Sequence, residues 1–247
     1  MHGDDRSLYL KDKFSKKGHL VDYISDLSAI RYDTVYDIAV LPIPLLDIDP
    51  YYNILKHSNI KKVIYASTDV NIIKAMDSCQ AVNLFDDEDL IFFYARLTAE
   101  AALAIAIGNG KRSIYGSKCL VSGYGRIGIL LVNLLRAMGA FVVVATGSLS
   151  HRKVLTAMDV GYILYDSLNC SLNNYDFIFN TVPDHIFNPD ILTDYTGIYY
   201  ELASKPYGFD YEQTGFGENR ILCSRLPGKY FPHSAALGIY EAIIKCT

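Results

Sequence analysis

A glycine-rich segment at residues 123–128 carries the clearest chemical signal in the sequence. It reads Gly-x-Gly-x-x-Gly and stands between an apolar run, residues 119–121, and a stretch of helical periodicity. In that setting Gly123 allows a tight turn, Gly125 lets the backbone approach a pyrophosphate, and Gly128 permits close packing of helix on sheet. The N–H groups of the helix's first turn can then bind phosphates. The segment therefore predicts a dinucleotide-binding turn; a glycine-rich turn in a nucleotide-free α/β domain is the alternative.

The end of the next strand candidate, residues 141–144, bears on which dinucleotide is bound. An acidic residue about 20 positions after the glycines would bind the adenosine ribose hydroxyls of NAD, but none is present there. The strand is followed by Thr146 and Ser148, and then by Arg152 and Lys153. Hydroxyl and basic side chains could accept the 2′-phosphate of NADP, so we favour NADP and leave NAD open. The alternative, that Arg152 and Lys153 belong to a solvated helix face, has equal weight.

Two further segments follow strand candidates and would lie beside the glycine turn. One is Asn-Thr-Val-Pro at residues 180–183, and the other is Leu-Ala-Ser-Lys-Pro at residues 202–206. Ligands of open α/β sheets bind beyond the carboxyl ends of the strands, so these segments and the glycine turn outline one crevice. Either segment alone could be an ordinary strand-to-loop transition. The residues predicted to bind the cofactor are Gly123, Tyr124, Gly125, Arg126, Ile127, Gly128, Thr146, Ser148, Arg152, Thr181, Val182, Pro183, Leu202 and Ala203.

The N-terminal part of the chain predicts a small parallel sheet. Helical patterns end near Lys17 and recur at residues 51–57 and 70–78. The strand candidates are residues 20–24, 36–41, 62–66 and 81–85. This alternation is typical of parallel strands joined by crossover helices. No apolar strand precedes Gly3, so we expect an N-terminally short chain whose first strand is missing or supplied differently.

A long helix-prone stretch at residues 87–107 separates this part from the glycine-rich unit and is predicted to be a linker helix. Later strand candidates are residues 162–165, 177–181, 198–202 and 221–223, and residues 235–245 are helical. The expected fold is α/β with two domains. Residues 1–108 form a flavodoxin-like or Rossmann-like domain with the linker helix, and residues 109–232 form an NAD(P)-binding Rossmann domain. Residues 233–247 form a C-terminal helix that packs back toward the first domain.

Composition narrows the partner and the compartment. The chain has 247 residues and a formal net charge of −4 at pH 7, which gives no broad basic surface for nucleic acid, so a small-molecule partner is expected. Its five cysteines are scattered without a C-x-x-C pair, which predicts reduced thiols. No apolar stretch approaches the about 20 residues of a membrane span, and no signal peptide pattern is present. We therefore expect a soluble, cytoplasmic protein without a membrane partner, and no metal site is predicted.

An ordered set of motifs adds a resemblance to these signals. The motifs are residues 3–6, 98–100, 123–128, 180–183, 202–206 and 226–232. Together they resemble the A-subunit family of dipicolinate synthase, a sporulation enzyme whose Rossmann half is related to the D-2-hydroxyacid dehydrogenases. The sequence is divergent, with Lys205 where the family has arginine, Tyr207 where it has glycine, and Gly147 near a usual arginine. Lysine keeps the charge but loses the bidentate fork that binds a carboxylate.

The resemblance implies an NAD(P)-dependent oxidation of a dihydrodipicolinate-type intermediate of the lysine pathway to dipicolinate, pyridine-2,6-dicarboxylate. It also implies that the partner is a flavoprotein-like B subunit and that the substrate site lies between the two domains. If the resemblance holds, the protein works in the mother-cell cytoplasm of a sporulating bacterium. Whether the chain also forms a homo-oligomer is left open. Aromatising a dihydropyridine needs a hydride acceptor, a base, and groups that hold two carboxylates. The predicted catalytic residues are Glu100, His233 and Lys205, and the predicted substrate-binding residues are Arg6, Arg96, Thr98, Ser204, Lys205 and Ser234.

Other interpretations remain open for these residues and for the function. Structural roles have somewhat greater weight for Glu100, on a helix surface or between domains, and for His233, in the first turn of the last helix. A rival function is a non-catalytic nucleotide-binding subunit or redox sensor. A second is a relative of the D-2-hydroxyacid dehydrogenases, although the sequence does not assemble their arginine and their Glu/His pair.

Overall fold

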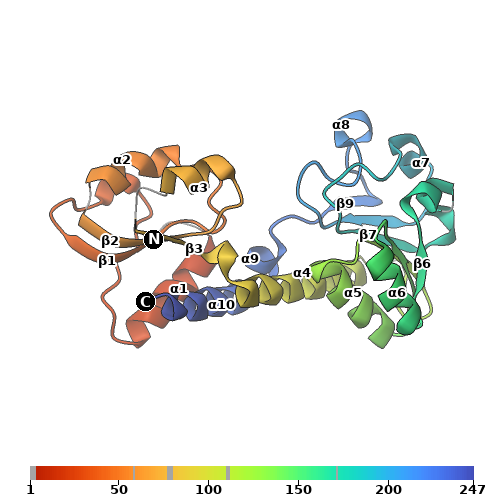
Figure 1. The fold of residues 1–247 in the computed structure, drawn as a ribbon, viewed down its shortest axis with the longest axis horizontal. Helices are drawn as coiled ribbons and strands as arrows, with labels where there is room; N and C mark the ends of the chain where they lie inside the picture. The colour runs from red at the N-terminus through yellow and green to blue at the C-terminus, as the bar shows by residue number, and fades with distance from the viewer. Residues whose placement is uncertain (1–3, 58, 77–79, 110–111, 171) are drawn as a thin grey trace. The chain divides into compact units, whose positions relative to one another are not determined.

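The computed structural model describes residues 4–57, 59–76, 80–109, 112–170 and 172–247. The predictions that involve Gly3, Gly110 and residues 77–79, Cys79 included, lie outside the described residues. The chain forms two compact units, and Figure 1 colours the ribbon along the chain from the N-terminus to the C-terminus.

The two units divide the chain at different points from the predicted domains. The first unit comprises Met1–Tyr94 together with Pro227–Thr247, and the second comprises Ala95–Leu226. The predicted divisions lay after residues 108 and 232, so both divisions of the structure come earlier along the chain. The last segment of the chain thus joins the first unit from Pro227 onward.

The first unit is built on a parallel sheet of three strands in the order β1-β2-β3. The strands are β1 (Val35–Val40), β2 (Asn59–Tyr65) and β3 (Ala81–Asn83), and the helices are α1 (Asp5–Lys16), α2 (Asp49–His57), α3 (Val70–Met76) and α10 (Pro232–Lys245). Short 3-10 helices span Leu27–Ala29 and Leu84–Asp86. Figure 1 shows α1 and α10 side by side, and the rings of Phe14 and Tyr240 lie 4.9 Å apart between them. Both ends of the chain therefore contribute to one core.

The strand predicted at residues 20–24 is wrong, because this segment is irregular and pairs with no strand. Leu20 is fully exposed, while Val21 packs against the core that α1 and α10 share. Tyr23 and Ile24 are half-buried like Val21, so the apolar residues of this segment do not alternate between two faces as those of a strand would. The strand that follows along the chain, β1, pairs with β2 in parallel register.

Helix α4 (Glu88–Gly108) carries the chain from the first unit into the second, and the division between the units falls inside it. Among the described residues it is the helix that is long and apolar enough to cross a membrane, by length and composition only. The expectation that no stretch approaches that length is therefore wrong. The finding is weak evidence for a span, since 44% of the apolar window is buried within the protein and core helices pass the same test.

The second unit contains a parallel sheet of six strands in the order β6-β5-β4-β7-β8-β9. The strands are β4 (Lys118–Ser122), β5 (Phe141–Ala145), β6 (Gly161–Ile163), β7 (Phe177–Asn180), β8 (Ile198–Glu201) and β9 (Arg220–Leu222). The helices are α5 (Arg126–Ala137), α6 (Leu149–Ala157), α7 (Pro189–Thr193) and α8 (Tyr211–Thr214), with 3-10 turns at Tyr165–Cys170 and Leu172–Asn174. Helix α9 (Leu226–Tyr230) follows, and the division between the units falls after its first residue. Counted within this unit, the strand order is 3-2-1-4-5-6, that of the Rossmann fold. The predicted α/β class with parallel sheets is confirmed.

The register of the central strands places their carboxyl ends in one row. Ser122, the last residue of β4, is opposite Asn180, the last residue of β7, and Asn180 is opposite Glu201, the last residue of β8. From β4 the chain first adds strands on one side of the sheet, β5 and β6, and then on the other side, β7 to β9. Open α/β sheets bind ligands at the carboxyl ends of the strands where the order reverses in this way, and this row of residues lies there.

Candidate nucleotide-binding site

The turn after β4 needs glycine at its first position. Gly123 has φ of +90°, a conformation that residues with a side chain rarely adopt. A Cβ built there would lie 2.6 Å from Oγ1 of Thr181 and 2.8 Å from Cγ2 of Val182. The turn is therefore packed directly against the segment that follows β7, as the crevice prediction requires.

The other two glycines serve different purposes. At Gly128 a Cβ would overlap the carbonyl oxygen of Gly123, so glycine is needed for α5 to begin close to the strand. At Gly125 a Cβ would meet nothing within 4 Å. Gly125 is also the N-cap of α5 and provides no side-chain hydrogen bond to the helix, so open space lies at a helix N-terminus whose N–H groups favour anions. These features fit the pyrophosphate of a dinucleotide.

The side chains of the residues between the glycines lie in different surroundings. Tyr124 is 4% exposed; its ring packs edge-on against His151, with centroids 5.7 Å apart, and its hydroxyl donates to the sulfur of Met158 at 3.4 Å. Tyr124 therefore fixes the turn against the helix α6 region. Arg126 is exposed and Ile127 is half-buried at the start of α5.

The end of β5 presents hydroxyl and basic groups. Thr146 is 1% exposed, and its Oγ1 accepts a hydrogen bond from the Ser148 N–H and lies 3.2 Å from Nδ1 of His151. Ser148 caps α6 by accepting from the His151 N–H. Nε of Arg152, in the same first turn, is buried and has no hydrogen-bond partner within the described residues. An unsatisfied guanidinium donor is a group that an anion would complete.

A buried polar network across the strand ends was missed by the sequence analysis. Ser122, Asn180 and Glu201 are each fully buried, and so is Tyr199. Ser122 Oγ donates to Asn180 Oδ1 at 2.7 Å, and Asn180 Nδ2 donates to Glu201 Oε1 at 2.7 Å. The signal was available, because a glutamate ends the otherwise apolar strand β8, and a buried carboxylate needs several donors.

Glu201 has those donors. Besides Asn180, its carboxylate accepts from the N–H of Ala203 at 3.0 Å, the N–H of Gly208 at 2.8 Å and the hydroxyl of Tyr199 at 2.7 Å. Burial raises the pKa of Glu201 above its usual 4.5, and the hydrogen bonds, led by that from Gly208, act in the opposite direction. The carboxylate fixes the start and the end of the loop that contains Ser204 and Lys205.

Of the predicted residues in that loop, Leu202 is buried and Ala203 is half-buried, while Ser204 and Lys205 are exposed. Nζ of Lys205 donates to the hydroxyl of Tyr211 at 3.2 Å and lies 5.4 Å from the centre of its ring. The hydrogen bond to Tyr211 raises the pKa of Lys205, so the side chain is a cation at neutral pH.

The segment after β7 is held in place by backbone contacts. Thr181 donates through both its N–H and its Oγ1 to the Ser122 carbonyl, at 3.0 and 2.8 Å. Val182 is half-buried and exchanges two hydrogen bonds with the Asn180 side chain, and Pro183 is exposed. This arrangement brings the predicted cofactor residues of β4 and β7 together.

The candidates on α4 are not brought to the glycine turn by any described contact. Arg96 and Glu100 are exposed, and Thr98 is half-buried. The position of Glu100 matches the helix-surface alternative. Its proposed role as a base remains a prediction.

Arg6, in the first unit, differs from the expectation of an available carboxylate clamp. It is 7% exposed, and its guanidinium donates to both carboxylate oxygens of Asp4, at 2.6 to 3.0 Å, and to the carbonyl of Ile43. A Cβ at Gly228 would lie 2.8 Å from Nε of Arg6, so α9 packs directly on this ion pair. These partners fit a structural role for Arg6, because its Nε and Nη2 groups already have acceptors.

The last helix carries the remaining candidates. His233 is exposed, and its ring lies edge-on to Tyr9 with centroids 5.2 Å apart, while Ser234 is half-buried. These contacts match the first-turn alternative for His233, and a catalytic role stays a prediction.

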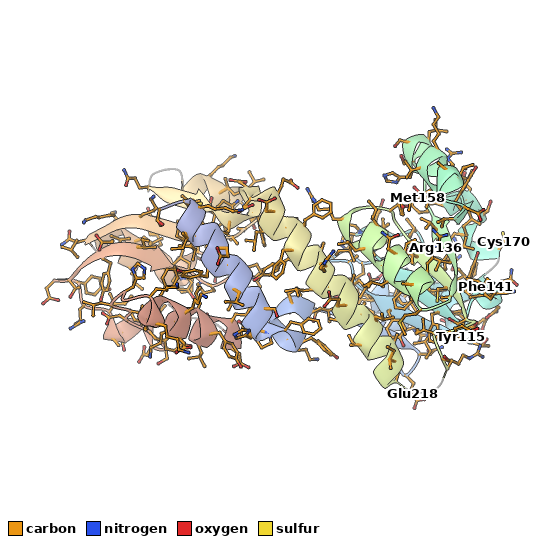
Figure 2. All side chains as sticks on the ribbon, turned by 90° about the horizontal axis from the view of Figure 1, so that it is seen from below. Tyr115, Arg136, Phe141, Met158, Cys170 and Glu218 are labelled. Atoms are coloured by element: carbon orange, nitrogen blue, oxygen red, sulfur yellow. The ribbon has the colours of Figure 1, made fainter. Side chains whose placement is uncertain are left out.

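A hollow at the opposite edge of the second unit is separate from this site. It has a volume of about 420 Å³ and lies at the amino ends of β8 and β9. Its lining includes Asn109, Thr196 and Glu218, the last of which is labelled in Figure 2.

Within the described residues, no group of three or more His, Cys, Asp or Glu side chains could hold a metal ion. Among the same residues, Cys119, Cys170, Cys223 and Cys246 form no disulfide.

Comparisons by sequence and by structure both find the A subunit of dipicolinate synthase. No family model matches the chain. The chain is 30% identical over 166 residues to the A subunit of dipicolinate synthase from Bacillus subtilis (strain 168), an alignment that covers 66% of this chain and 56% of that protein. Its fold is similar to the crystal structure of the same subunit from Bacillus halodurans, with a TM-score of 0.81 and 21% identity, over 100% of this chain and 95% of that one.

A more distant likeness extends to a dehydrogenase. The apo-structure of D-lactate dehydrogenase from Escherichia coli has a TM-score of 0.65 at 13% identity and covers 98% of this chain and 93% of its own. At these identities the structural likenesses establish the fold. The resemblance predicted from the motifs is confirmed.

Proposed function

We propose an activity for this chain from one premise: it is a relative of the A subunit of dipicolinate synthase, similar to it in sequence and in fold. The proposed activity is the NAD(P)-dependent oxidation of a dihydrodipicolinate-type intermediate to dipicolinate during sporulation. The chain would act in the cytoplasm within a two-subunit synthase, and its partner there would be a flavoprotein-like B subunit.

The observation that carries the proposal is the open space at Gly125, the N-cap of α5. A turn that needs glycine at positions 123 and 128 for packing, but has room at 125, is suited to a pyrophosphate. The N–H groups at the start of α5 would hold the phosphates, and the Thr181–Val182 segment would bound the same space.

NADP is the proposed cofactor, ahead of NAD. No carboxylate follows β5, and the first turn of α6 offers Ser148, His151 and the unsatisfied Nε of Arg152. A 2′-phosphate would give that Nε an acceptor. NAD would rely on the hydroxyls of Thr146 and Ser148.

The chemistry that a bound nicotinamide supplies is acceptance of a hydride from the dihydropyridine ring. Lys205, held as a cation beside Tyr211, would bind one substrate carboxylate. Ser204, exposed in the same loop, would donate to the substrate. The loop itself would keep its shape because Glu201 holds both of its ends. Glu100 and His233 remain the proposed bases.

The decisive test compares nucleotide binding and turnover. Calorimetric titration of NADP and NAD should give binding to the wild type, and Gly125→Val should abolish it while the circular dichroism spectrum is retained. Gly217→Val, at a glycine of the same unit, serves as the control. Unchanged affinity in Gly125→Val would remove the proposal. Reduction of NADP with enzymatically generated dihydrodipicolinate, with and without the B subunit, then tests the reaction.

A non-catalytic nucleotide-binding subunit is the second candidate function. The observation in its favour is that Arg6, a predicted substrate clamp, is buried in an ion pair with Asp4. If the chain binds NADP but neither binds dipicolinate nor reduces NADP with the B subunit present, this function replaces the first.

A further inference from the structure

We infer that Glu201 is a positioning residue that holds the cofactor-side turn after β7 and the substrate-side loop after β8 in one fixed arrangement. The inference rests on the proposed function for the identity of the two ligands. The coupling itself rests on hydrogen bonds among fully buried groups.

On the substrate side, Glu201 acts directly. Its two carboxylate oxygens accept from the N–H groups of Ala203 and Gly208, which begin and end the loop that presents Ser204 and Lys205. Gly208 is held from the other side as well, because its carbonyl accepts from the N–H groups of Ile186 and Phe187. The spacing of Ser204 and Lys205 from the strand end is therefore set by one carboxylate.

On the cofactor side, Glu201 acts through Asn180. The Asn180 amide donates to Glu201 Oε1, and this contact leaves Asn180 Oδ1 to accept from the N–H of Val182 and from Ser122 Oγ. Val182 and Thr181 are the residues that a Cβ on Gly123 would strike. A change at Glu201 is thus transmitted to the wall of the dinucleotide turn.

The chemistry of the network explains why a carboxylate is needed. Oε1 accepts from Asn180 and Ala203, and Oε2 accepts from Tyr199 and Gly208. An ionised carboxylate can accept at both oxygens, whereas a glutamine would direct its NH₂ group at an N–H donor in either orientation. Glu201→Gln therefore keeps the shape of the side chain but leaves at least one backbone N–H without an acceptor.

The test uses amide hydrogen exchange and ligand binding on the full chain. In Glu201→Gln, exchange should accelerate at Ala203, Gly208 and Val182, and the dissociation constant for dipicolinate should rise about tenfold. That for NADP should rise by a smaller factor, about threefold, because the effect on the dinucleotide turn passes through Asn180.

Two variants separate positioning from stability. Tyr195→Phe removes another buried hydroxyl, which donates to the Tyr175 carbonyl at 3.0 Å, and should lower stability without changing either affinity. Tyr199→Phe, which removes one donor to Glu201, should raise exchange at Gly208 and weaken dipicolinate two- to fivefold. If Glu201→Gln does not fold, this variant decides the question.

The outcomes are distinct from those of the proposed function. Unchanged exchange at both segments in folded Glu201→Gln overturns the inference, and so does faster exchange with both affinities unchanged. If the wild type binds neither NADP nor dipicolinate, the proposed function fails, while the exchange data still decide whether Glu201 holds the two segments.

Discussion

Replacing Gly208 by alanine should be among the most damaging single-methyl changes in the second unit. Gly208 is buried, and a Cβ there would lie 2.5 Å from both Nδ2 of Asn180 and the hydroxyl of Tyr199. Neither atom can move away freely, since both donate to Glu201 at 2.7 Å. The backbone of Gly208 cannot retreat either, because its N–H and its carbonyl are both hydrogen-bonded.

The magnitude follows from these contacts. Inserting a methyl group into a packed site costs about 1–3 kcal/mol, and losing one hydrogen bond to a charged group costs about 1.5–3 kcal/mol. The free energy of unfolding should therefore fall by about 2.5–6 kcal/mol, out of about 5–15 kcal/mol for a typical domain. At roughly 3 °C per kcal/mol for a domain of this size, the Tm should fall by about 8–18 °C.

Scanning calorimetry and urea unfolding of the full chain measure this loss. The matched control is Gly217→Ala, where the nearest atom to a built Cβ is 3.8 Å away and φ is not positive, so the stability change should stay within about 0.5 kcal/mol. The reasoning is refuted if the two variants differ by less than about 1 kcal/mol.

The other predictions concern the glycine turn, the nucleotide phosphate, the substrate cation and pH. Gly128→Ala, whose methyl would overlap the Gly123 carbonyl, should abolish NADP binding in calorimetry; retained binding would mean that α5 can shift. Arg152→Met should weaken NADP about tenfold and leave NAD unchanged, and an equal loss for both nucleotides would show that Arg152 does not contact the 2′-phosphate. Lys205→Met should weaken dipicolinate about five- to tenfold, because its cation is lost, whereas Lys17→Met, at a surface lysine of the first unit, should have no effect. Because burial raises the pKa of Glu201, the folded chain binds this proton more tightly than the unfolded chain, so the stability linked to the proton is fully present below the unfolded pKa near 4.5 and is lost as pH rises through the folded pKa. In urea unfolding, the free energy of unfolding of the wild type relative to Glu201→Gln should therefore decrease with rising pH across that window, and an increase would contradict the raised pKa.

The Rossmann half was predictable because its local signals agree with its tertiary structure. The glycine spacing, the apolar run before it and the helical pattern after it all describe one βα unit, and β4 and α5 form where expected. The segments after β7 and β8 were placed correctly at strand ends, since parallel strands bring their carboxyl ends to one edge.

What sequence reasoning missed depends on contacts between distant residues. Asp4 is only two residues from Arg6, but the burial of Arg6 against the carbonyl of Ile43 depends on a residue 37 positions away, so the sequence could not distinguish a ligand clamp from a structural ion pair. Glu201 was overlooked because its donors include the side chain of Asn180, at the end of another strand, and because the N–H groups of Ala203 and Gly208 reach it only through the folding of the loop after β8. The apolar residues at 20–24 resembled a strand, although only tertiary pairing could have made one.

The make-up of the first unit also has a consequence for the order of folding during synthesis. Residues 95–226 form the second unit as one continuous stretch, so it can close as soon as that stretch has left the ribosome. The first unit lacks α10 until residues 232–245 have been made, and with it Ala236, Ile239 and Ile243 of its core. The nascent chain would therefore carry an unfinished hydrophobic surface in its first unit while the second is being made, and the half translated later would fold first.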